Sequence, residues 1–543
     1  MKILQSVILS IIYYFILSRA DDSSDDFVVH LSTGSVRGKI AKGENGNEFY
    51  SFRRIPYAEP PVGNLRFKPP VSKISWNGVL DATEDGPSCT QLNFFTKEYE
   101  GQEDCLYLNV YTPKLPKDKE NLKMDVVYWI NGGGFLAMAG TSAYAGPERF
   151  PLQDDVILVS VTYRINVMGF LSTNDSASPG NYGLLDQVEG LKWVRENIHY
   201  FGGDPNKVTI MGESAGGASV IYQMLTPLTK GLFHRAIAMS GSALCSWARQ
   251  KVPLYWSKKL GEDIGCPTES SCELVNCLRQ KPVEEIIHKG NFSFYGLPPI
   301  TNAPVVDNYF IEDTPLNLIK QKKYHTDVPL IIGITKDEGT FFLLGRNASV
   351  DFTDDEINNS LKQAIDVLPN VDDKIKLIRA KYSDNPKSYS DEDVISYLGP
   401  ILNDGFFHKC VLHTAEEMIK SGTKTYFYKY DYEAPFSASE FAHRPPKYGA
   451  VHMDDLFMFF TGIYKEANFD ETSTVMKNKF QNLFINFIKS GKPNADSEVD
   501  CEWPQAKPNE LSICHININC SISVYDQAKD PSYNFWINEI NKA

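Results

Sequence analysis

Two nearly continuous apolar segments, residues 124–130 and 156–163, stand out in the first third of the chain. Uninterrupted runs of this length are typical of parallel strands that helices cover on both faces. Apolar residues then recur at intervals of three and four between residues 183 and 199, which predicts a helix. Similar strands are expected at residues 208–212, 236–240, 328–335 and 426–430. This alternation predicts an α/β fold with a large, mostly parallel, twisted sheet flanked by helices.

The remaining pattern is less regular. Short strands are expected at residues 28–31, 35–39 and 106–111, and prolines exclude regular structure from a loop at 56–70. Residues 266–312 have the composition of a loop-rich segment, and residues 351–421 that of amphipathic helices. We interpret these two segments as a helical and loop cap over the sheet. A buried amphipathic helix is expected at 480–488.

No linker, low-complexity run or repeat divides the 543 residues, so one domain over residues 21–543 is the simplest interpretation. Residues 1–20 have the features of a secretory signal peptide: Lys2, a mostly apolar stretch, and small residues before Asp21. A membrane anchor is the alternative, but polar residues interrupt the apolar stretch and follow it at once. The last residues lack the hydrophobic tail of a lipid-anchor signal. We therefore expect a secreted, extracellular protein.

The composition limits the classes of partner that the protein can have. The formal net charge is −14, which disfavours nucleic acid or an anionic membrane as a partner. Ten cysteines in a secreted chain favour disulfides. Sequons that would mark a glycoprotein begin at Asn174, Asn291, Asn347, Asn358 and Asn519.

A serine lies between two glycines at the centre of the chain. The apolar strand at 208–212 leads directly into Ser214, and residues 215–225 then have the pattern of a helix. Gly212 and Gly216 leave room for a tight turn that exposes the serine hydroxyl, which is the nucleophile elbow of Gly-x-Ser-x-Gly hydrolases. The alternative is a Ser/Gly turn with no chemical role.

A serine hydroxyl needs a base, and the base needs an acid that orients it. Among the later histidines, His452 precedes an apolar segment in a loop that suits a positioned base, and we prefer it to His443. His408 and His413 lie in an amphipathic pattern that favours a structural role. Candidate acids follow the strand at 328–335 directly, and spacing does not choose between the adjacent Asp337 and Glu338.

Acyl transfer also needs backbone amides where negative charge develops on the carbonyl oxygen. Asn131 and three glycines follow the strand at 124–130 and could aim two amides inward. The amide of Ala215 would be the third donor. The triple glycine lacks the Gly-Lys-Ser/Thr of a phosphate-binding loop, so nucleotide binding is disfavoured.

Several longer motifs join these residues. They are Tyr57-Ala58-Glu59-Pro60-Pro61-Val62-Gly63-Asn64-Leu65-Arg66-Phe67, Glu103-Asp104-Cys105-Leu106-Tyr107-Leu108-Asn109-Val110, Gly180-Asn181-Tyr182-Gly183-Leu184-Leu185-Asp186-Gln187 and Phe201-Gly202-Gly203-Asp204-Pro205. With the elbow, they make the chain resemble the carboxylesterase/cholinesterase family (type-B carboxylesterases) of α/β-hydrolases over nearly its whole mature length. The stretch from Met239 to Cys245 is similar to that of insect-type secreted esterases.

The resemblance implies specific roles. Ser214 would be the nucleophile, Glu338 the acid and His452 the base. Oxyanion donors would be Gly133, Gly134 and Ala215, with Glu213 as a supporting carboxylate. It also implies the disulfides Cys89–Cys105 and Cys266–Cys277, and the ion pairs Arg66–Glu103 and Arg164–Asp186. Cys245, Cys272, Cys410, Cys501, Cys514 and Cys520 stay unassigned, although Cys501 could pair with Cys514 or Cys520.

Three departures limit the assignment. The family usually has His where this chain has Asn131, which affects hydrogen bonding in the glycine loop. A cholinesterase would need a tryptophan between the first two bridged cysteines, and residues 90–104 contain none. Juvenile-hormone esterases typically carry Gln where Glu213 stands.

We therefore expect a secreted carboxylic-ester hydrolase that acts on small hydrophobic esters through an acyl-enzyme, without a metal or organic cofactor. The alternatives are a catalytically silent, esterase-like adhesion or binding protein, and a lipase or juvenile-hormone-type esterase. The sequence leaves the physiological ester and the oligomeric state open.

Overall fold

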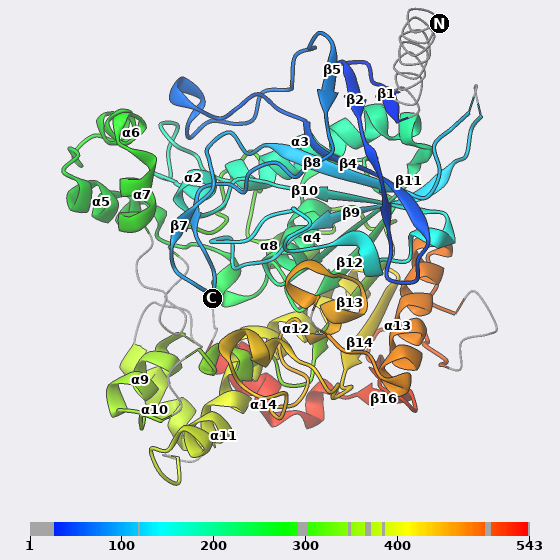
Figure 1. Cartoon of the computed structure of the whole chain (residues 1–543). Coiled ribbons are helices and arrows are strands. Elements are labelled where there is room, and N and C mark those ends of the chain that lie inside the picture. Colours follow the sequence, from blue (N-terminus) through cyan, green and yellow to red (C-terminus); the bar gives the residue numbers. More distant parts are fainter. Residues whose placement is uncertain are drawn as a thin grey trace, which may run out of the picture.

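The computed structural model describes residues 27–117, 120–290, 301–345, 349–363, 371–382, 386–465, 467–494 and 501–540. The segment expected to be a signal peptide lies outside these residues. Figure 1 shows a twisted central sheet with helices on both of its faces and helical groups at one side.

The central sheet has eleven strands in the order β16-β15-β14-β13-β12-β11-β9-β10-β8-β4-β3. All neighbours from β10 to β15 pair in parallel, and antiparallel strands extend the sheet at both edges. The predicted large and mostly parallel sheet is therefore confirmed. Its strands are β3 (Lys39–Lys42), β4 (Glu48–Pro56), β8 (Tyr107–Thr112), β9 (Met124–Ile130), β10 (Val156–Val161), β11 (Gly203–Glu213), β12 (Arg235–Met239), β13 (Leu330–Thr335), β14 (Thr425–Tyr430), β15 (Leu511–Ile516) and β16 (Ser521–Tyr525).

Burial on both faces explains the continuous apolar runs. Every residue of β9 is buried, and its side chains alternate between two cores. Val126 and Tyr128 belong to the core on one face of the sheet, whereas Val127 and Trp129 belong to the core on the other. A strand with this environment has no polar face, which is why the sequence pattern identified its bounds.

Two small sheets complete the strands. One joins β1 (Val28–His30), β2 (Ser35–Arg37) and β5 (Val79–Asp81), and the other is the hairpin of β6 (Gln91–Leu92) and β7 (Tyr99–Glu100). The expected strand at 35–39 is two strands, β2 and β3, because Gly38 packs against Phe52 and ends the first of them. The expected loop at 56–70 holds one short 3-10 helix, η1 (Gly63–Leu65).

The helices agree with most of the expected pattern. Residues 351–421 are largely helical, as predicted, and α9, α10 and α11 form one group beside the sheet (Figure 1). The helices are α2 (Asn166–Phe170), α3 (Tyr182–Asn197), α4 (Ala215–Leu225), α5 (Pro253–Ile264), α6 (Ser271–Gln280), α7 (Val283–Gly290), α8 (Pro315–Lys320), α9 (Asp354–Gln363), α10 (Val371–Tyr382), α11 (Asp391–Leu402), α12 (Lys409–Ser421), α13 (Glu471–Ser490) and α14 (Pro531–Asn534).

The prediction of a loop-rich segment at 266–312 is wrong for its first half, which contains α6 and α7. Ser270 caps α6 by accepting a hydrogen bond from the amide of Glu273. Leu274 and Leu278 lie one turn apart on the buried face of this helix. The amphipathic spacing was present, but it extends over less than three turns. Residues 291–300 lie outside the described chain.

Four disulfides link the described residues: Cys89–Cys105, Cys245–Cys410, Cys266–Cys277 and Cys501–Cys520. Cys501 therefore pairs with Cys520, one of the two partners that the sequence left open. Cys272 is an exposed thiol and Cys514 a buried one.

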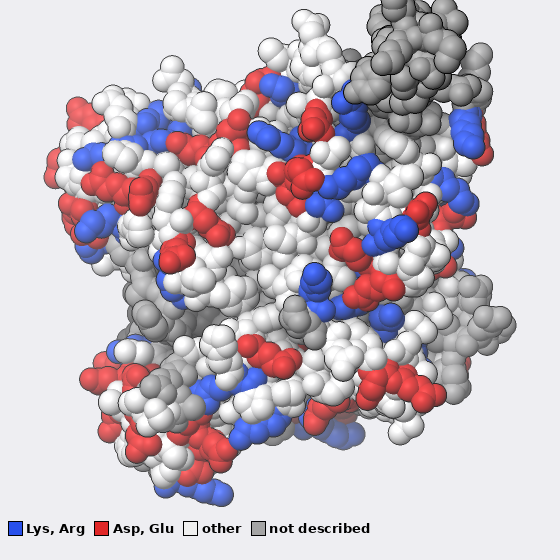
Figure 2. Space-filling view, viewed as in Figure 1, with Lys and Arg blue, Asp and Glu red and all other residues white. Residues whose placement is uncertain are grey.

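The surface carries charges of both signs. Figure 2 shows Lys and Arg side chains intermingled with Asp and Glu over one face of the molecule. Of the sequon asparagines, Asn174 and Asn519 are exposed, and the partly buried Asn358 accepts a hydrogen bond from Arg379. Asn291 and Asn347 lie outside the described residues. Among the residues described, none of the helices has both the length and the apolar character that crossing a bilayer requires.

Candidate active site

Ser214 occupies the turn between β11 and α4. Its backbone has φ of 57° and ψ of −120°, a conformation that side-chain-bearing residues rarely adopt. The turn closes only because its flanks are glycines: a Cβ on Gly216 would lie 2.0 Å from the carbonyl oxygen of Ile130, and one on Gly212 would lie 2.5 Å from that of Gly216. The sequence thus places the serine hydroxyl at the N-terminus of a helix, where developing negative charge is stabilised.

Glu338 and His452 form a short, buried hydrogen bond. Nδ1 of His452 lies 2.5 Å from Oε2 of Glu338, and both side chains are almost completely excluded from solvent. The other carboxylate oxygen accepts a hydrogen bond from the amide of Thr335 at 2.7 Å. Burial alone would raise the pKa of Glu338, but the His452 imidazole and its hydrogen bond outweigh that effect and lower the pKa. Glu338 is therefore held as a carboxylate that orients the imidazole.

The second ring nitrogen of His452 faces Glu213. Nε2 lies 3.1 Å from Oε1 of Glu213, and the Ser214 hydroxyl forms no hydrogen bond with any residue that the structure describes. A Cβ placed on Gly132 would lie 2.7 Å from Oε2 of Glu213 and 3.1 Å from the Cβ of Ser214. The Glu213 carboxylate therefore lies close to both the imidazole and the Ser214 side chain.

The competing candidates from the sequence lie elsewhere. The backbone of Asp337 pairs with that of Ala450, and its side chain lies against Gly449 rather than against the imidazole. His443 ends the 3-10 helix η9 (Ala438–Ala442). His413 bonds the hydroxyl of Tyr533, in agreement with a structural role.

The glycine loop adopts a backbone conformation that favours glycine. Gly133 and Gly134 have φ of 98° and 65°, and a Cβ on Gly133 would lie 2.2 Å from the carbonyl oxygen of Ala137. In the described part of the chain, the amides of Gly133, Gly134 and Ala215 have no hydrogen-bond partner. Asn131 supports the loop because its Nδ2 donates to the Gly132 carbonyl at 3.2 Å, and its own carbonyl accepts from the hydroxyl of Tyr163 at 2.8 Å.

The imidazole is surrounded by more carboxylates than the sequence suggested. Burial raises the pKa of Glu213 well above its usual range, and the carboxylates of Asp455 and Glu338 add to this effect. Burial and Glu338 likewise raise the pKa of Asp455 to about 7. The Tyr428 hydroxyl donates to Asp455 at 2.8 Å. Sequence reasoning did not identify Asp455, although it lies three residues after His452, as expected for one face of a helical turn.

Aromatic rings enclose the histidine. The ring of Phe407 lies 4.5 Å from that of His452, and the rings of Phe342 and Phe341 lie at 5.3 and 6.2 Å. Phe341 in turn stacks on Phe94, from the β6–β7 turn. The imidazole is therefore packed among aromatic rings as well as carboxylates and is almost fully buried, which strengthens the electrostatic interactions around it.

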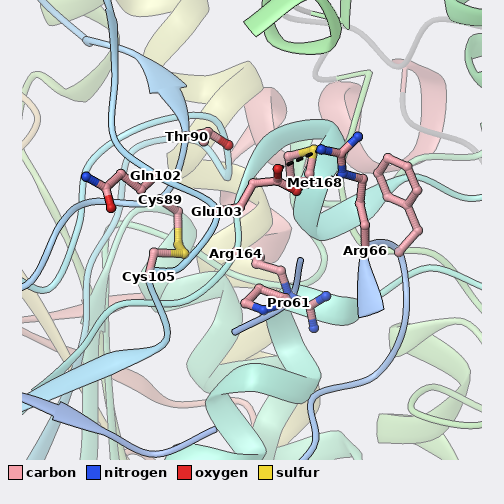
Figure 3. A pocket seen from close by; sticks show the side chains of 10 residues that line it. Pro61, Arg66, Cys89, Thr90, Gln102, Glu103, Cys105, Arg164 and Met168 are labelled. Carbon is pink, nitrogen blue, oxygen red and sulfur yellow. Dashed lines mark hydrogen bonds and ion pairs between the residues drawn. A yellow bond between two sulfur atoms is a disulfide. The ribbon is translucent and has the colours of Figure 1, made fainter. Parts of the chain in front are cut away.

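The ion pairs that the resemblance implied are present. Arg66 binds Glu103 in a bidentate pair at 2.6 and 2.7 Å, and Arg164 binds Asp186 similarly. A small pocket lies between the first pair and the Cys89–Cys105 disulfide (Figure 3). Its volume of about 10 Å³ corresponds to roughly one water molecule, so it is too small for an ester substrate.

One group of three side chains in the described chain has atoms that could ligate a metal: the sulfurs of Cys501, Cys514 and Cys520. Two of these sulfurs form a disulfide and so offer no thiolate. The group lies on β15 and its neighbouring loops. Ser214 and Glu213 lie instead at the end of β11, Glu338 follows β13, and His452 lies just before the 3-10 helix η10 (Asp454–Met458).

A mostly parallel sheet whose serine sits on a strained strand-to-helix turn is the architecture of α/β-hydrolases, and the chain has that fold. Residues 25–536 match the model of the Carboxylesterase family. The chain belongs to this family, and it is a carboxylic-ester hydrolase.

Individual relatives agree along most of the chain. Esterase FE4 of Myzus persicae is 34% identical over 513 residues, which cover 89% of this chain and 88% of the relative. Venom carboxylesterase-6 of Apis mellifera is 33% identical over a match that covers 90% of this chain and 89% of the relative. Liver carboxylesterase B-1 of Rattus norvegicus is 33% identical over a match that covers 95% of this chain and 94% of the relative. The predicted resemblance is confirmed.

Proposed function

We propose that the chain is a secreted serine esterase in which Ser214, His452 and Glu338 form a catalytic triad. The observation that carries the proposal is the imidazole of His452, whose Nδ1 is fixed by Glu338 and whose Nε2 faces Glu213, the residue directly before Ser214. Rotation about the serine side-chain torsion would bring the hydroxyl to Nε2 in place of Glu213. Burial and the nearby carboxylates raise the pKa of Glu213 and so disfavour its charged form, which makes it a weak ion-pair partner that can yield this position.

The reaction would proceed by acyl transfer. His452 removes the proton of Ser214 as its oxygen attacks the ester carbonyl, and the tetrahedral oxyanion receives hydrogen bonds from the amides of Gly133, Gly134 and Ala215. His452 then gives its proton to the leaving alcohol. Water attacks the acyl-enzyme by the same route and releases the acid. Glu338 stabilises the imidazolium that forms in both halves.

The substrates we propose are small esters with hydrophobic acyl or alcohol groups, because Phe341, Phe342 and Phe407 surround the base. A relative from Tribolium castaneum, 33% identical, is called juvenile hormone esterase. Glu213 in place of the usual Gln argues against the same specificity here, and hydrolysis of a juvenile-hormone ester compared with short p-nitrophenyl esters tests this.

Secretion and glycosylation are part of the proposal. The apolar segment at 3–17 supports cleavage and export, and four disulfides suit an oxidising compartment. Exposure of Asn174 and Asn519 suits glycan attachment. Mass spectrometry of protein from the medium of expressing cells would locate the mature N-terminus and the glycans.

The test of the triad uses Ser214→Ala and a fluorophosphonate probe. We expect the wild-type chain to be labelled at Ser214 and to hydrolyse p-nitrophenyl butyrate. Ser214→Ala should do neither, with an unchanged melting temperature. Equal turnover by the variant would refute the triad. Absence of both labelling and turnover in the wild-type chain would favour the alternative of a silent binding protein.

A further inference from the structure

The short segment between α11 and α12 touches both the acid and the base of the proposed triad. This segment, η8 (Asn403–His408), is a π-helical turn, a local irregularity that is frequent at functional sites. It lies directly on the turn that carries Glu338, because a Cβ on Gly339 would be 2.4 Å from the amide nitrogen of Asn403. Contact this close between two backbones fixes their separation.

Two hydrogen bonds from η8 hold the acid-bearing turn at its ends. Oδ1 of Asn403 accepts from the amide of Gly339 at 2.5 Å, immediately after Glu338. At the other end, Nε2 of His408 lies 3.0 Å from the carbonyl oxygen of Thr335. Since the carbonyl can only accept, this nitrogen carries the proton. Burial lowers the pKa of His408 to about 4, so the ring remains neutral at physiological pH.

The same segment holds the base. The ring of Phe407 lies 4.5 Å from the imidazole of His452, inclined by 35°. The ring of Phe407 also stacks on that of Phe342, with centroids 5.5 Å apart and planes inclined by 16°. The ring of Phe342 itself lies next to the imidazole. The two phenyl rings thus restrict the plane of the imidazole, while Glu338 fixes its Nδ1 edge.

A disulfide connects this segment with the loop that packs against the turn of Ser214. Cys410, two residues after η8, is bonded to Cys245 in the loop that follows β12. That loop packs under the serine turn, since a Cβ on Gly241 would lie 2.0 Å from the carbonyl oxygen of Ser214. A second link is a hydrogen bond of 2.5 Å between the hydroxyls of Ser242 and Thr414. The chain segments that support all three proposed catalytic residues are therefore joined covalently.

We propose that η8, anchored by the Cys245–Cys410 disulfide, is the positioning element of the acid–base pair, with Asn403 holding the carboxylate and Phe407 holding the imidazole. The proposal rests on the proposed triad. Its physical basis is that small displacements of reacting groups lower rates strongly. Neither residue touches the reacting atoms, so each acts through Glu338 or His452.

The experiment compares Asn403→Leu with Asn403→Asp, and Phe407→Leu with Phe535→Leu. Leucine removes the acceptor at 403 with little change in volume, whereas aspartate retains it. Phe535 is a buried ring of the same core as Phe407, but its ring contacts are with Tyr382 and Trp536 and not with the histidine. It therefore controls for lost packing. The readouts are kcat and KM for p-nitrophenyl butyrate from pH 5 to 9, the fluorophosphonate labelling rate, and the melting temperature.

We expect Asn403→Leu and Phe407→Leu to lower kcat roughly tenfold, the size of one lost hydrogen bond or ring contact, with KM changed by less than about twofold. The acidic limb of kcat/KM should move to lower pH, because a displaced carboxylate stabilises the imidazolium less. Asn403→Asp should remain within about threefold of wild type. Phe535→Leu should lower the melting temperature but leave kcat and the acidic limb unchanged.

Wild-type kcat and pH profiles in both leucine variants, with only a lower melting temperature, would overturn the proposal. If Asn403→Leu does not fold, Asn403→Ala takes its place. The double variant Cys245→Ala/Cys410→Ala should show the same loss of kcat while folded, and full activity in that variant refutes the role of the disulfide. Ser214→Ala separates the two proposals: turnover by it refutes the triad, whereas an inactive Ser214→Ala with unaffected η8 variants refutes the positioning role alone.

Discussion

Replacement of Glu338 by glutamine tests the electrostatic core of the site. The amide is almost isosteric, and its oxygen can still accept the hydrogen bond from the amide of Thr335. What is lost is the negative charge 2.5 Å from Nδ1 of His452. The NH2 group of the glutamine then faces Nδ1 and can only donate, so the acceptor that fixes the tautomer of the imidazole is lost as well. The change in rate therefore reports the charge together with this hydrogen bond.

The magnitude follows from Coulomb's law. At 2.5 Å and an effective dielectric constant of about 20, opposite unit charges attract by about 6.6 kcal/mol. Since each 1.36 kcal/mol of barrier is tenfold in rate, complete loss of this attraction in the transition state would lower kcat by about 10⁵. The loss is typically about 10⁴ when the acid of a serine-hydrolase triad becomes an amide, and we expect that value here.

The assay is kcat/KM for p-nitrophenyl butyrate at pH 7.5, with Asp337→Asn as a matched control. Asp337 is the adjacent carboxylate, and its side chain lies against Gly449 rather than the imidazole. We expect the control to remain within about threefold of wild type while Glu338→Gln loses about 10⁴. A loss of less than tenfold in Glu338→Gln, or an equal loss in the control, would refute the assignment of the acid.

Three further predictions concern the oxyanion loop, the buried acid and the cysteines. Gly133→Ala should lower kcat by about 10²–10³, because a Cβ would lie 2.2 Å from the Ala137 carbonyl; wild-type kcat contradicts this. The pKa of Asp455 is raised from 3.8 to about 7 by burial and Glu338, so its contribution to stability is fully present below pH 4 and is lost as the pH rises through 7, about 4 kcal/mol at most. Asp455→Asn should therefore make the urea midpoint of unfolding less dependent on pH between 5 and 8.5. If the midpoints of variant and wild type change with pH in parallel, the prediction is wrong. Burial raises the pKa of the Cys514 thiol to about 12. Iodoacetamide at pH 8 should therefore modify the exposed Cys272 but reach Cys514 only after unfolding. Peptide mapping that finds Cys514 in a disulfide would disprove the Cys501–Cys520 pairing.

The sequence identified the elements that are buried on both sides. The expected bounds of β9 and α4 agree with the structure, because an uninterrupted apolar strand and a helix that begins at a glycine-flanked serine have few alternatives. β16 was missed for the opposite reason. Residues of β16 are mostly exposed, so serines alternate with apolar residues there and no buried face is apparent in the pattern.

For the site, too, the sequence predicted one part and left another open. Asp337 and Glu338 are adjacent in the sequence, and only the position of the β13 strand end decides which carboxylate faces the histidine. Spacing cannot resolve a choice of one residue, since one step along an extended chain reverses the direction of the side chain. The family resemblance supplied Glu338, and the geometry gives the physical reason: its carboxylate reaches both the Thr335 amide and the imidazole.

Contacts that join distant segments were beyond any local pattern. Cys245 and Cys410 are separated by 165 residues, and their pairing depends on how α12 lies on the loop after β12. Likewise, nothing in the sequence of η8 marks a π-helical turn or indicates that Asn403 and Phe407 lie against Glu338 and His452. Local chemistry therefore predicts which residues can react, whereas their mutual placement is a property of the packed sheet and of the segments that lie across its strand ends.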